Sequence, residues 1–175
     1  MARSRANPEV GIITGSRNDW RVAIGAAAIL EQFEVSYEKG VKSVHRTPEL
    51  AREYAREAEE NELKIIIAAA GGSAALPGMV ASWTEIPVIG IPIATRKDPL
   101  GERAQHSMDD MPEGSPLLLV GVDQARQAGH MAIKILALSN PALREALKND
   151  RARMQARVVR DHNAIAGMSL SDFRE

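Results

Sequence analysis

The segment 43–48 combines three side chains that can bind an anion and move a proton beside it. It has the sequence Ser-Val-His-Arg-Thr-Pro and follows a weakly alternating run that predicts a strand over 35–41. His45 can exchange a proton near neutral pH, and the guanidinium of Arg46 can hold a phosphate through two parallel hydrogen bonds. The alternative is a surface turn whose polar side chains cap a helix beginning at Pro48. This segment alone favours neither interpretation.

A second turn with possible ligand groups is the segment 14–19, Thr-Gly-Ser-Arg-Asn-Asp, which follows an apolar run predicted as a strand over 10–14. The Ser16 hydroxyl and the backbone N–H groups at the start of the next helix suit an anionic phosphate. Asp19 could hold ribose hydroxyls or cap the helix predicted over 20–33. Because a Gly-Ser turn alone is weak evidence, the structural interpretation is favoured for this segment on its own.

The third turn is glycine-rich and spans residues 70–78, directly after the strongest apolar run of the chain, at 63–70. Its glycines allow the backbone to approach a ligand closely, and its N–H groups could surround an anion. A turn selected only for positive φ angles is an equally good explanation. The segment lacks both the Gly-Lys-Ser/Thr ending of a Walker loop and the Gly-x-Gly-x-x-Gly dinucleotide fingerprint.

The elements that must position these turns alternate between strands and helices. Apolar runs predict strands over 10–14, 35–41, 63–70, 87–91 and 116–122. Helical spacing, with start signals at Asp19, Thr47-Pro48 and Asp123, predicts helices over 20–33, 47–61, 77–83, 123–138 and 141–160. This alternation indicates an α/β fold with a five-stranded parallel sheet, helices on both faces and C-terminal helices. Ligands of such sheets bind beyond the carboxyl ends of the strands, where the three turns would meet.

The length of 175 residues fits one folded domain. We expect a flexible N-terminal tail over 1–8, a single α/β catalytic domain over 9–162 and a C-terminal tail over 163–175. The segment 94–115 is polar and long for a connection, which predicts a functional loop. Small residues around Gly129, on the helix predicted over 123–138, favour close helix packing, either within the chain or between subunits.

Composition excludes several classes of function. A net charge of -1 and only two each of Trp, Tyr and Phe argue against a nucleic-acid partner. The absence of cysteine excludes disulfides, thiolate metal sites and a cysteine nucleophile, and it suits the cytoplasm. No apolar run approaches the roughly 18–20 residues of a membrane helix, so we expect no membrane partner. No two histidines have metal-ligand spacing; we expect no metal, and we assign His106, His130 and His162 exposed or structural roles.

Taken in order, the three turns and a fourth segment resemble one known family. The matching segments are Gly15-Ser16-x-x-Asp19-Trp20, Ser43-x-His45-Arg46-Thr47-Pro48, Gly71-Gly72-x-Ala74-x-Leu76-Pro77-Gly78-Met79 and Met111-Pro112-x-Gly114-x-Pro116. They are similar to motifs of the N5-carboxyaminoimidazole ribonucleotide mutase and phosphoribosylaminoimidazole carboxylase family of bacterial purine biosynthesis. The resemblance covers residues 8–150. Several motifs in the same order along the chain are far more specific evidence than any single motif.

The resemblance implies a flavodoxin-like three-layer α/β/α sandwich, assembled as a homo-octamer with active sites at subunit junctions. It implies a small ribonucleotide substrate and carbon dioxide as partners, and no cofactor. By position, the residues that would bind the ribose 5-phosphate portion are Ser16, Asp19, Ser43 and Arg46. Those whose backbone would hold the migrating carboxylate or carbon dioxide are Gly71, Gly72, Ser73 and Leu76. His45 would be the general acid and base of a carboxyl shift.

The chain departs from the family pattern at several positions of this implied site. Ala75 stands where the family usually has histidine, Asn18 where it has serine, and Gln127 where it has asparagine. The segment 101–105 reads Gly-Glu-Arg-Ala-Gln instead of Gly-x-Asp-Ser-Leu. Two alternatives to the family reaction therefore stay open: a paralogue that carboxylates or decarboxylates another heterocyclic nucleotide, and a non-catalytic nucleotide-binding protein. His45 argues against the second, because a binding module needs no base there.

Overall fold

The central sheet consists of five parallel strands in the order β2-β1-β3-β4-β5. We analysed a computed structural model that describes residues 7–169 and 172. The strands are β1 (Val10–Thr14), β2 (Tyr37–Val41), β3 (Ile65–Gly71), β4 (Val88–Ile93) and β5 (Leu118–Leu119). The helices are η1 (Arg17–Asp19), α1 (Trp20–Gln32), α2 (Pro48–Arg56), α3 (Ala75–Ala81), α4 (Glu102–Asp109), α5 (Ala125–Leu136) and α6 (Pro141–Ala166). This strand order is that of flavodoxin-like folds.

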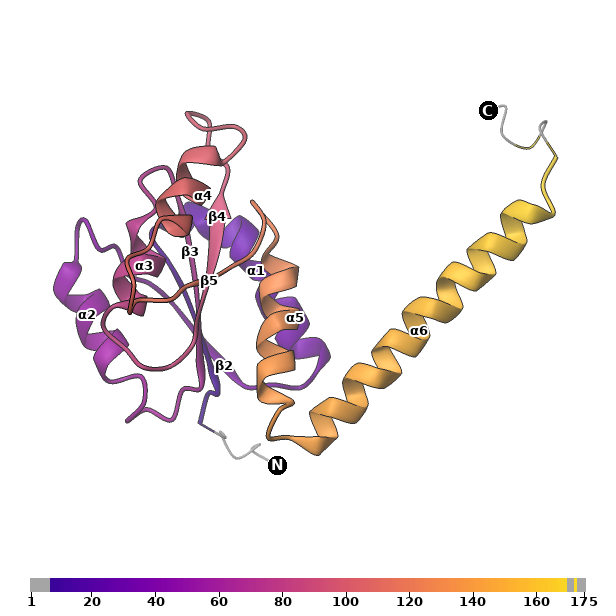
Figure 1. The fold of residues 1–175 in the computed structure, drawn as a ribbon, viewed down its shortest axis with the longest axis horizontal. Helices are drawn as coiled ribbons and strands as arrows, with labels where there is room; N and C mark the ends of the chain where they lie inside the picture. Colours follow the sequence, from indigo (N-terminus) through magenta and orange to yellow (C-terminus); the bar gives the residue numbers. More distant parts are fainter. Residues whose placement is uncertain (1–6, 170–171, 173–175) are drawn as a thin grey trace. The chain divides into compact units, whose positions relative to one another are not determined.

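The sheet is covered on both faces, which confirms the predicted three-layer α/β class. Figure 1 shows α1 and α5 on one face and α2, α3 and α4 on the other. All residues of β1 and β4 are buried, as are the first six of β3. Burial on both faces explains why these strands are continuous apolar runs, whereas the edge strand β2 is only partly buried and alternates weakly.

The small residues of α5 serve packing within the chain. A Cβ placed on Gly129 would lie 2.7 Å from the Cβ of Ile29 and 2.9 Å from the carbonyl oxygen of Ala26, both on α1. Gly25 of α1 also lies close to the start of α5, where its Cβ would meet the Cβ of Ala125 at 3.3 Å. The two helices therefore approach each other closely because glycine stands at their contact, and the intramolecular alternative for this face is correct.

Several predicted boundaries are wrong, each for a local reason. The helix predicted over 47–61 ends at Arg56, and turns follow until Glu62, whose φ is positive at 62°. The strand predicted over 116–122 shortens to Leu118–Leu119, which pairs with only two residues of β4. The segment 94–115, expected as a loop, contains the helix α4.

Of the three predicted helix caps, two stand at the predicted position without a capping hydrogen bond, and the third lies before its helix. Asp19 and Thr47 occupy the N-cap positions of α1 and α2, but neither side chain makes a capping hydrogen bond. Asp123 lies two positions before α5 with a φ of 58°, and its Oδ1 accepts a hydrogen bond from the N–H of Ala94 instead. These side chains are thus available to the turns at the carboxyl edge of the sheet.

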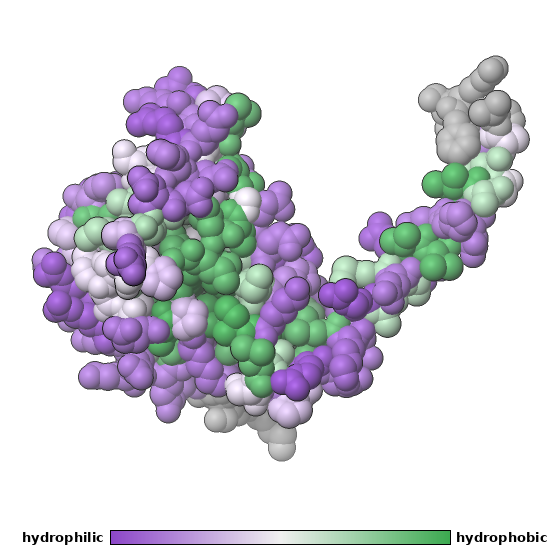
Figure 2. All heavy atoms as spheres, viewed as in Figure 1, coloured by the Kyte–Doolittle hydropathy of each residue, from purple (hydrophilic) through white to green (hydrophobic). Residues whose placement is uncertain are grey.

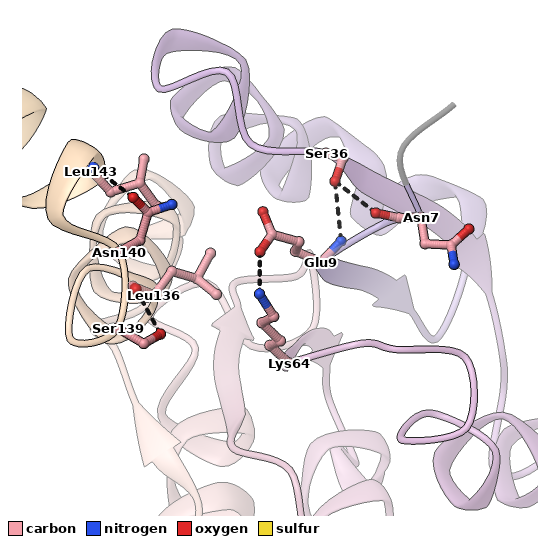
Figure 3. Close-up of polar contacts among 8 residues, drawn as sticks. All are labelled: Asn7, Glu9, Ser36, Lys64, Leu136, Ser139, Asn140 and Leu143. Atoms are coloured by element: carbon pink, nitrogen blue, oxygen red, sulfur yellow. Dashed lines mark hydrogen bonds and ion pairs between the residues drawn. The ribbon is translucent and has the colours of Figure 1, made fainter. Parts of the chain in front are cut away.

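The amino-terminal edge of the sheet is held by polar contacts close to the chain start. The Ser36 hydroxyl accepts from the N–H of Glu9 and donates to the carbonyl oxygen of Asn7, as Figure 3 shows. The Glu9 carboxylate also pairs with the ammonium of Lys64. These contacts join the segments that enter β1, β2 and β3, so the strands start together and their carboxyl ends fall at one edge.

Residues 136–175 form a second compact unit by their contacts, separate from residues 1–135. Within it, the Asn140 side chain caps α6 by accepting from the N–H groups of Ala142 and Leu143, the latter drawn in Figure 3. The helix runs to Ala166, six residues beyond the predicted end and into the predicted tail. The N-terminal tail residues 1–6 and the tail residues 170–171 and 173–175 lie outside the described residues.

The surface of α6 mixes hydrophilic and apolar side chains, as Figure 2 shows. Met154, Val158 and Ile165 are each more than half exposed. Within residues 7–169 and 172, no helix is long and apolar enough to cross a membrane.

Candidate active site

A cavity of about 890 Å³ lies at the carboxyl edge of the sheet. The turns that follow β1, β2, β3 and β4 all contribute to its wall. Of the residues predicted from sequence, those that line it are Ser16, Asp19, Ser43, His45, Arg46, Gly71, Ser73 and Leu76. The cavity lies where the chain order reverses between β1 and β3, which is the usual ligand position in open α/β sheets.

The first wall is the turn after β1, which a short 3-10 helix closes. The Thr14 hydroxyl donates to the carbonyl oxygen of Ser16 at 2.9 Å. The Ser16 hydroxyl in turn donates to Oδ2 of Asp19 at 2.8 Å. Asp19 therefore faces the cavity turn and does not cap α1, which leaves its carboxylate able to accept further hydrogen bonds from a ligand's hydroxyl groups.

The second wall is the turn after β2, which Thr47 closes. The Thr47 hydroxyl donates to the carbonyl oxygen of Ser43 at 3.1 Å and accepts from the N–H of Ser43 at 3.2 Å. Arg46 Nε donates to Oγ of Ser43 at 3.3 Å, and its terminal nitrogen donates to the carbonyl oxygen of Gly15 at 3.0 Å. The guanidinium therefore joins the first two turns and is fixed in place before any ligand binds.

His45 lies between the second turn and the glycine-rich loop. Its Nε2 is 3.1 Å from the carbonyl oxygen of Ser73, so Nε2–H donates to that carbonyl. The histidine is exposed, and it lines the cavity. One ring nitrogen is thus held by the protein, and the imidazole is positioned at the cavity wall where it can exchange a proton.

The glycine-rich loop forms the third wall, and Gly71 is required there by space. A Cβ on Gly71 would lie 2.6 Å from Cγ2 of Thr95 and 2.9 Å from the carbonyl oxygen of Ile93. Gly72 has a φ of 68°, with nothing within 4 Å of an added Cβ, and it does not line the cavity. Gly72 therefore makes the turn, whereas Gly71 brings the loop against the end of β4.

The charges of the cavity wall are mainly positive. Four arginines line it, Arg17, Arg21, Arg46 and Arg96, and Asp19 is the one carboxylate among the residues that the structure describes there. A chain with a net charge of -1 thus concentrates guanidinium groups at one edge of its sheet. Such a site suits a ligand with several negative charges.

Sequence inspection missed Arg17, Arg21, Thr95 and Arg96. The signal for the last two was present, because they directly follow β4 and the rule that strand ends carry ligands applies there as well. Asn18, one of the departures from the family pattern, also lines the cavity, whereas Ala75 begins α3. No group of three or more His, Asp or Glu residues that could hold a metal ion occurs in the described part of the chain.

The flavodoxin-like sheet and the arginine-lined cavity with a fixed histidine define an α/β enzyme that acts on a small anionic molecule. The model of the family described as AIR carboxylase matches residues 9–157, and the chain belongs to this family. It is 49% identical over 148 residues to the N5-carboxyaminoimidazole ribonucleotide mutase of Pyrococcus abyssi, which covers 85% of this chain and 84% of the relative. It is 44% identical over 166 residues to the N5-carboxyaminoimidazole ribonucleotide mutase of Thermotoga maritima, a match that covers 95% of this chain and 96% of the relative.

A solved structure supports the same assignment. The crystal structure of Treponema denticola PurE superposes with a TM-score of 0.81 and 26% sequence identity. The match covers 90% of this chain and 98% of that one. The fold predicted from sequence and the family suggested by its motifs are thereby confirmed.

Proposed function

We propose that the protein converts N5-carboxyaminoimidazole ribonucleotide to 4-carboxy-5-aminoimidazole ribonucleotide in de novo purine biosynthesis. The observation that carries this proposal is the fixed His45 beside the glycine-rich loop, in a cavity lined by four arginines. A second support is the similarity to relatives named as mutases, such as that of Pyrococcus abyssi, which is 49% identical.

The ribose 5-phosphate portion is assigned to the first two walls. Arg46 provides a charged fork for the phosphate, and the Ser43 hydroxyl, whose oxygen accepts from Arg46, can donate to it. The Ser16 hydroxyl donates to the phosphate by leaving Oδ2 of Asp19. Asp19 accepts hydrogen bonds from the ribose hydroxyls. Because Arg46 is already bonded to Gly15 and Ser43, little side-chain freedom is lost when the phosphate binds.

The chemistry is a carboxyl shift in two halves. In the first, His45 donates a proton to the exocyclic nitrogen while the carbamate C–N bond breaks, which releases the aminoimidazole and carbon dioxide. In the second, the nucleophilic ring carbon attacks carbon dioxide to form the C–C bond, and His45 accepts the proton that leaves this carbon. The proton that His45 gives in the first half returns to it in the second, so the reaction as proposed needs no cofactor.

Carbon dioxide must stay in the site between the two halves. We assign it to the backbone of Gly71, Ser73 and Leu76, next to the histidine that faces Ser73. Loss of carbon dioxide to water would end the transfer, so a closed, positioned site supplies much of the rate.

The test follows the ultraviolet change when purified protein is mixed with N5-carboxyaminoimidazole ribonucleotide. We expect enzymatic turnover, which His45→Asn lowers by about 10²- to 10⁴-fold. His106→Asn is the matched control: His106 lies on α4, is exposed and does not line the cavity, so its loss is expected to leave turnover unchanged. Full activity of His45→Asn contradicts the assigned proton transfer, and wild-type protein without turnover contradicts the reaction.

The assembly and location are further parts of this proposal. We infer a homo-octamer with sites at subunit junctions, which rests on the family resemblance, and a cytoplasmic location, which the cysteine-free composition suits. Light scattering of the purified protein checks the octamer, since it gives the mass of the particle in solution. A mass of one chain, 19.0 kDa, contradicts it.

A further inference from the structure

The turn after β4 carries the positively charged Arg96, which has no role in the reaction proposed above. Arg96 lines the cavity and is exposed. Arg46 donates two hydrogen bonds to other residues, whereas the guanidinium of Arg96 makes no hydrogen bond or ion pair with any residue that the structure describes. Its binding capacity is therefore available to a ligand.

The backbone that carries Arg96 is tightly held. Thr95 and Asp98 exchange two backbone hydrogen bonds, of 2.9 and 3.1 Å, so Arg96 and Lys97 form the tip of a two-residue turn. Asp98 is only 7% exposed, and its Oδ2 accepts from the N–H groups of Arg103 and Ala104 at the start of α4. The turn is thus fixed both to itself and to the following helix.

Ala94, which precedes this turn, is held by hydrogen bonds at both its N–H and its carbonyl group. Arg21 donates to the carbonyl oxygen of Ala94 at 3.1 Å, and the N–H of Ala94 donates to Oδ1 of Asp123 at 3.1 Å. Arg21 lines the cavity and adds a second positive charge at this end, whereas Asp123 does not line it. The end of β4 therefore presents a positive wall on a rigid backbone.

This wall is distant from the proposed phosphate position and close to the glycine-rich loop. The order β2-β1-β3-β4 places the end of β4 three strand spacings from the end of β2, or about 14 Å at the backbone. Gly71 contacts Thr95 directly, since an added Cβ would lie 2.6 Å from its Cγ2. A ligand with its phosphate at Arg46 would extend toward Arg96 across the glycine-rich loop.

We propose that Arg96 is a specificity-determining residue that pairs with the carboxylate of the ribonucleotide, at the end of the molecule opposite its phosphate. The inference rests on the proposed function. It makes the preferred ligand a nucleotide with an anionic group at each end, and it means that the site distinguishes the carboxylated nucleotide from 5-aminoimidazole ribonucleotide, which lacks that group.

The test measures the binding of two nucleotides to the full chain by calorimetry. The ligands are 4-carboxy-5-aminoimidazole ribonucleotide and 5-aminoimidazole ribonucleotide, which differ by the carboxylate alone. Arg96→Ala is expected to weaken binding of the carboxylated nucleotide about tenfold and to leave the other unchanged. Arg96→Lys keeps the positive charge without the two parallel donors of the guanidinium. It is expected to lose less affinity for the carboxylated nucleotide than Arg96→Ala does.

Lys97→Ala is the matched control, because Lys97 belongs to the same two-residue tip and carries the same charge but does not line the cavity. It is expected to change neither affinity. Equal losses for both nucleotides in Arg96→Ala, or no loss for either, overturn the role of Arg96 and leave the proposed reaction intact. Wild-type protein that binds neither nucleotide contradicts the proposed function itself, and this inference with it.

Discussion

The two ends of the cavity wall are built differently. At the β2 end, Arg46 is bonded to Ser43 and Gly15, and Ser16 is bonded to Asp19, so the side chains proposed to bind the ribose and phosphate have internal partners. At the β4 end, the backbone is held by Asp98 and Asp123, but the guanidinium of Arg96 has no partner among the described residues. Arg46 at one end is therefore held by its side chain, whereas Arg96 at the other end is held only through its backbone.

This difference suggests a division of labour between the ends. A side chain that is already fixed binds a constant group of the substrate with little further loss of conformational freedom. A free guanidinium on a rigid turn loses conformational freedom when it binds. Only a ligand with an anion in the right place offsets this loss. The phosphate end would supply affinity, and the Arg96 end would supply discrimination.

The largest test of this division is Arg46→Ala. It is expected to weaken both nucleotides equally, by about 10- to 100-fold, because the phosphate they share loses charge-assisted hydrogen bonds. The measurement is the same calorimetric titration. Arg56→Ala is a suitable control, since it removes one positive charge from α2 at a position away from the cavity. If Arg46→Ala affects only the carboxylated nucleotide, the two ends have been assigned the wrong way round.

The sequence predicted the β2 end and missed the β4 end for a physical reason. The first three strands end in turns with a local signature, such as His45 with Arg46 before a proline. The buried apolar runs of β1 and β3 and the weak alternation of β2 place those turns. The segment 94–115 has no apolar period, because α4 buries only Ala104 and Met108. The first turn of α4 is held by the Asp98 carboxylate, which accepts from the N–H groups of Arg103 and Ala104. A contact over five or six residues lies outside the short spacing by which a cap is recognised in a sequence.

Helix caps were the least predictable feature, because the expected capping side chains found partners across turns. Thr47 bonds Ser43 instead of α2, and Asp123 bonds Ala94, 29 positions earlier. Hydrogen bonds of that kind depend on the strand order, which brings the ends of distant strands together. The class of fold was therefore accessible from apolar periodicity, while the detailed walls of the site required the assembled sheet.

A second test concerns the junction between the two ends, at Gly71. Gly71→Ala would place a methyl group 2.6 Å from Cγ2 of Thr95 and 2.9 Å from the carbonyl oxygen of Ile93. We expect a loss of about 1–3 kcal/mol in the free energy of unfolding, measured by denaturant titration, because neither strand can move freely. Turnover should fall as well, because the loop that we propose to hold carbon dioxide shifts.

Gly15→Ala is the control for this junction. Gly15 also lies in the cavity wall, but its added Cβ would meet nothing closer than 3.7 Å, an ordinary contact. Its free energy of unfolding is expected to stay close to that of the wild type. Equal stability of both variants would mean that the glycine-rich loop is not tightly joined to the β4 turn, and the proposed path of the ligand across it would lose its support.

The smallest expected effect concerns Tyr54 of α2, the helix that follows the turn at the β2 end. Burial raises the pKa of its hydroxyl above the usual value near 10, and the carboxylate of Glu38 on β2 raises the pKa further, while the ammonium of Lys42 lies 4.3 Å from the ring centroid. In the unfolded chain this tyrosine loses its proton near pH 10, whereas in the folded chain it stays protonated to higher pH. Stability should therefore fall as pH rises above about 10.

Tyr54→Phe should change stability little at pH 7 and reduce the alkaline loss, as measured by denaturant unfolding at pH 7, 10 and 11. The matched control is Tyr37→Phe, which removes the hydroxyl of the other tyrosine of the chain. A hydrogen bond to Glu31, with a smaller contribution from burial, raises the pKa of Tyr37 to about 12. Tyr37 is only partly buried, and its pKa is raised less than that of Tyr54, so the loss of its hydroxyl should reduce the alkaline loss less. If stability depends on pH in the same way in wild type and Tyr54→Phe, Tyr54 does not titrate with a raised pKa in the folded chain. The two ends of the cavity would then differ only in their side-chain contacts.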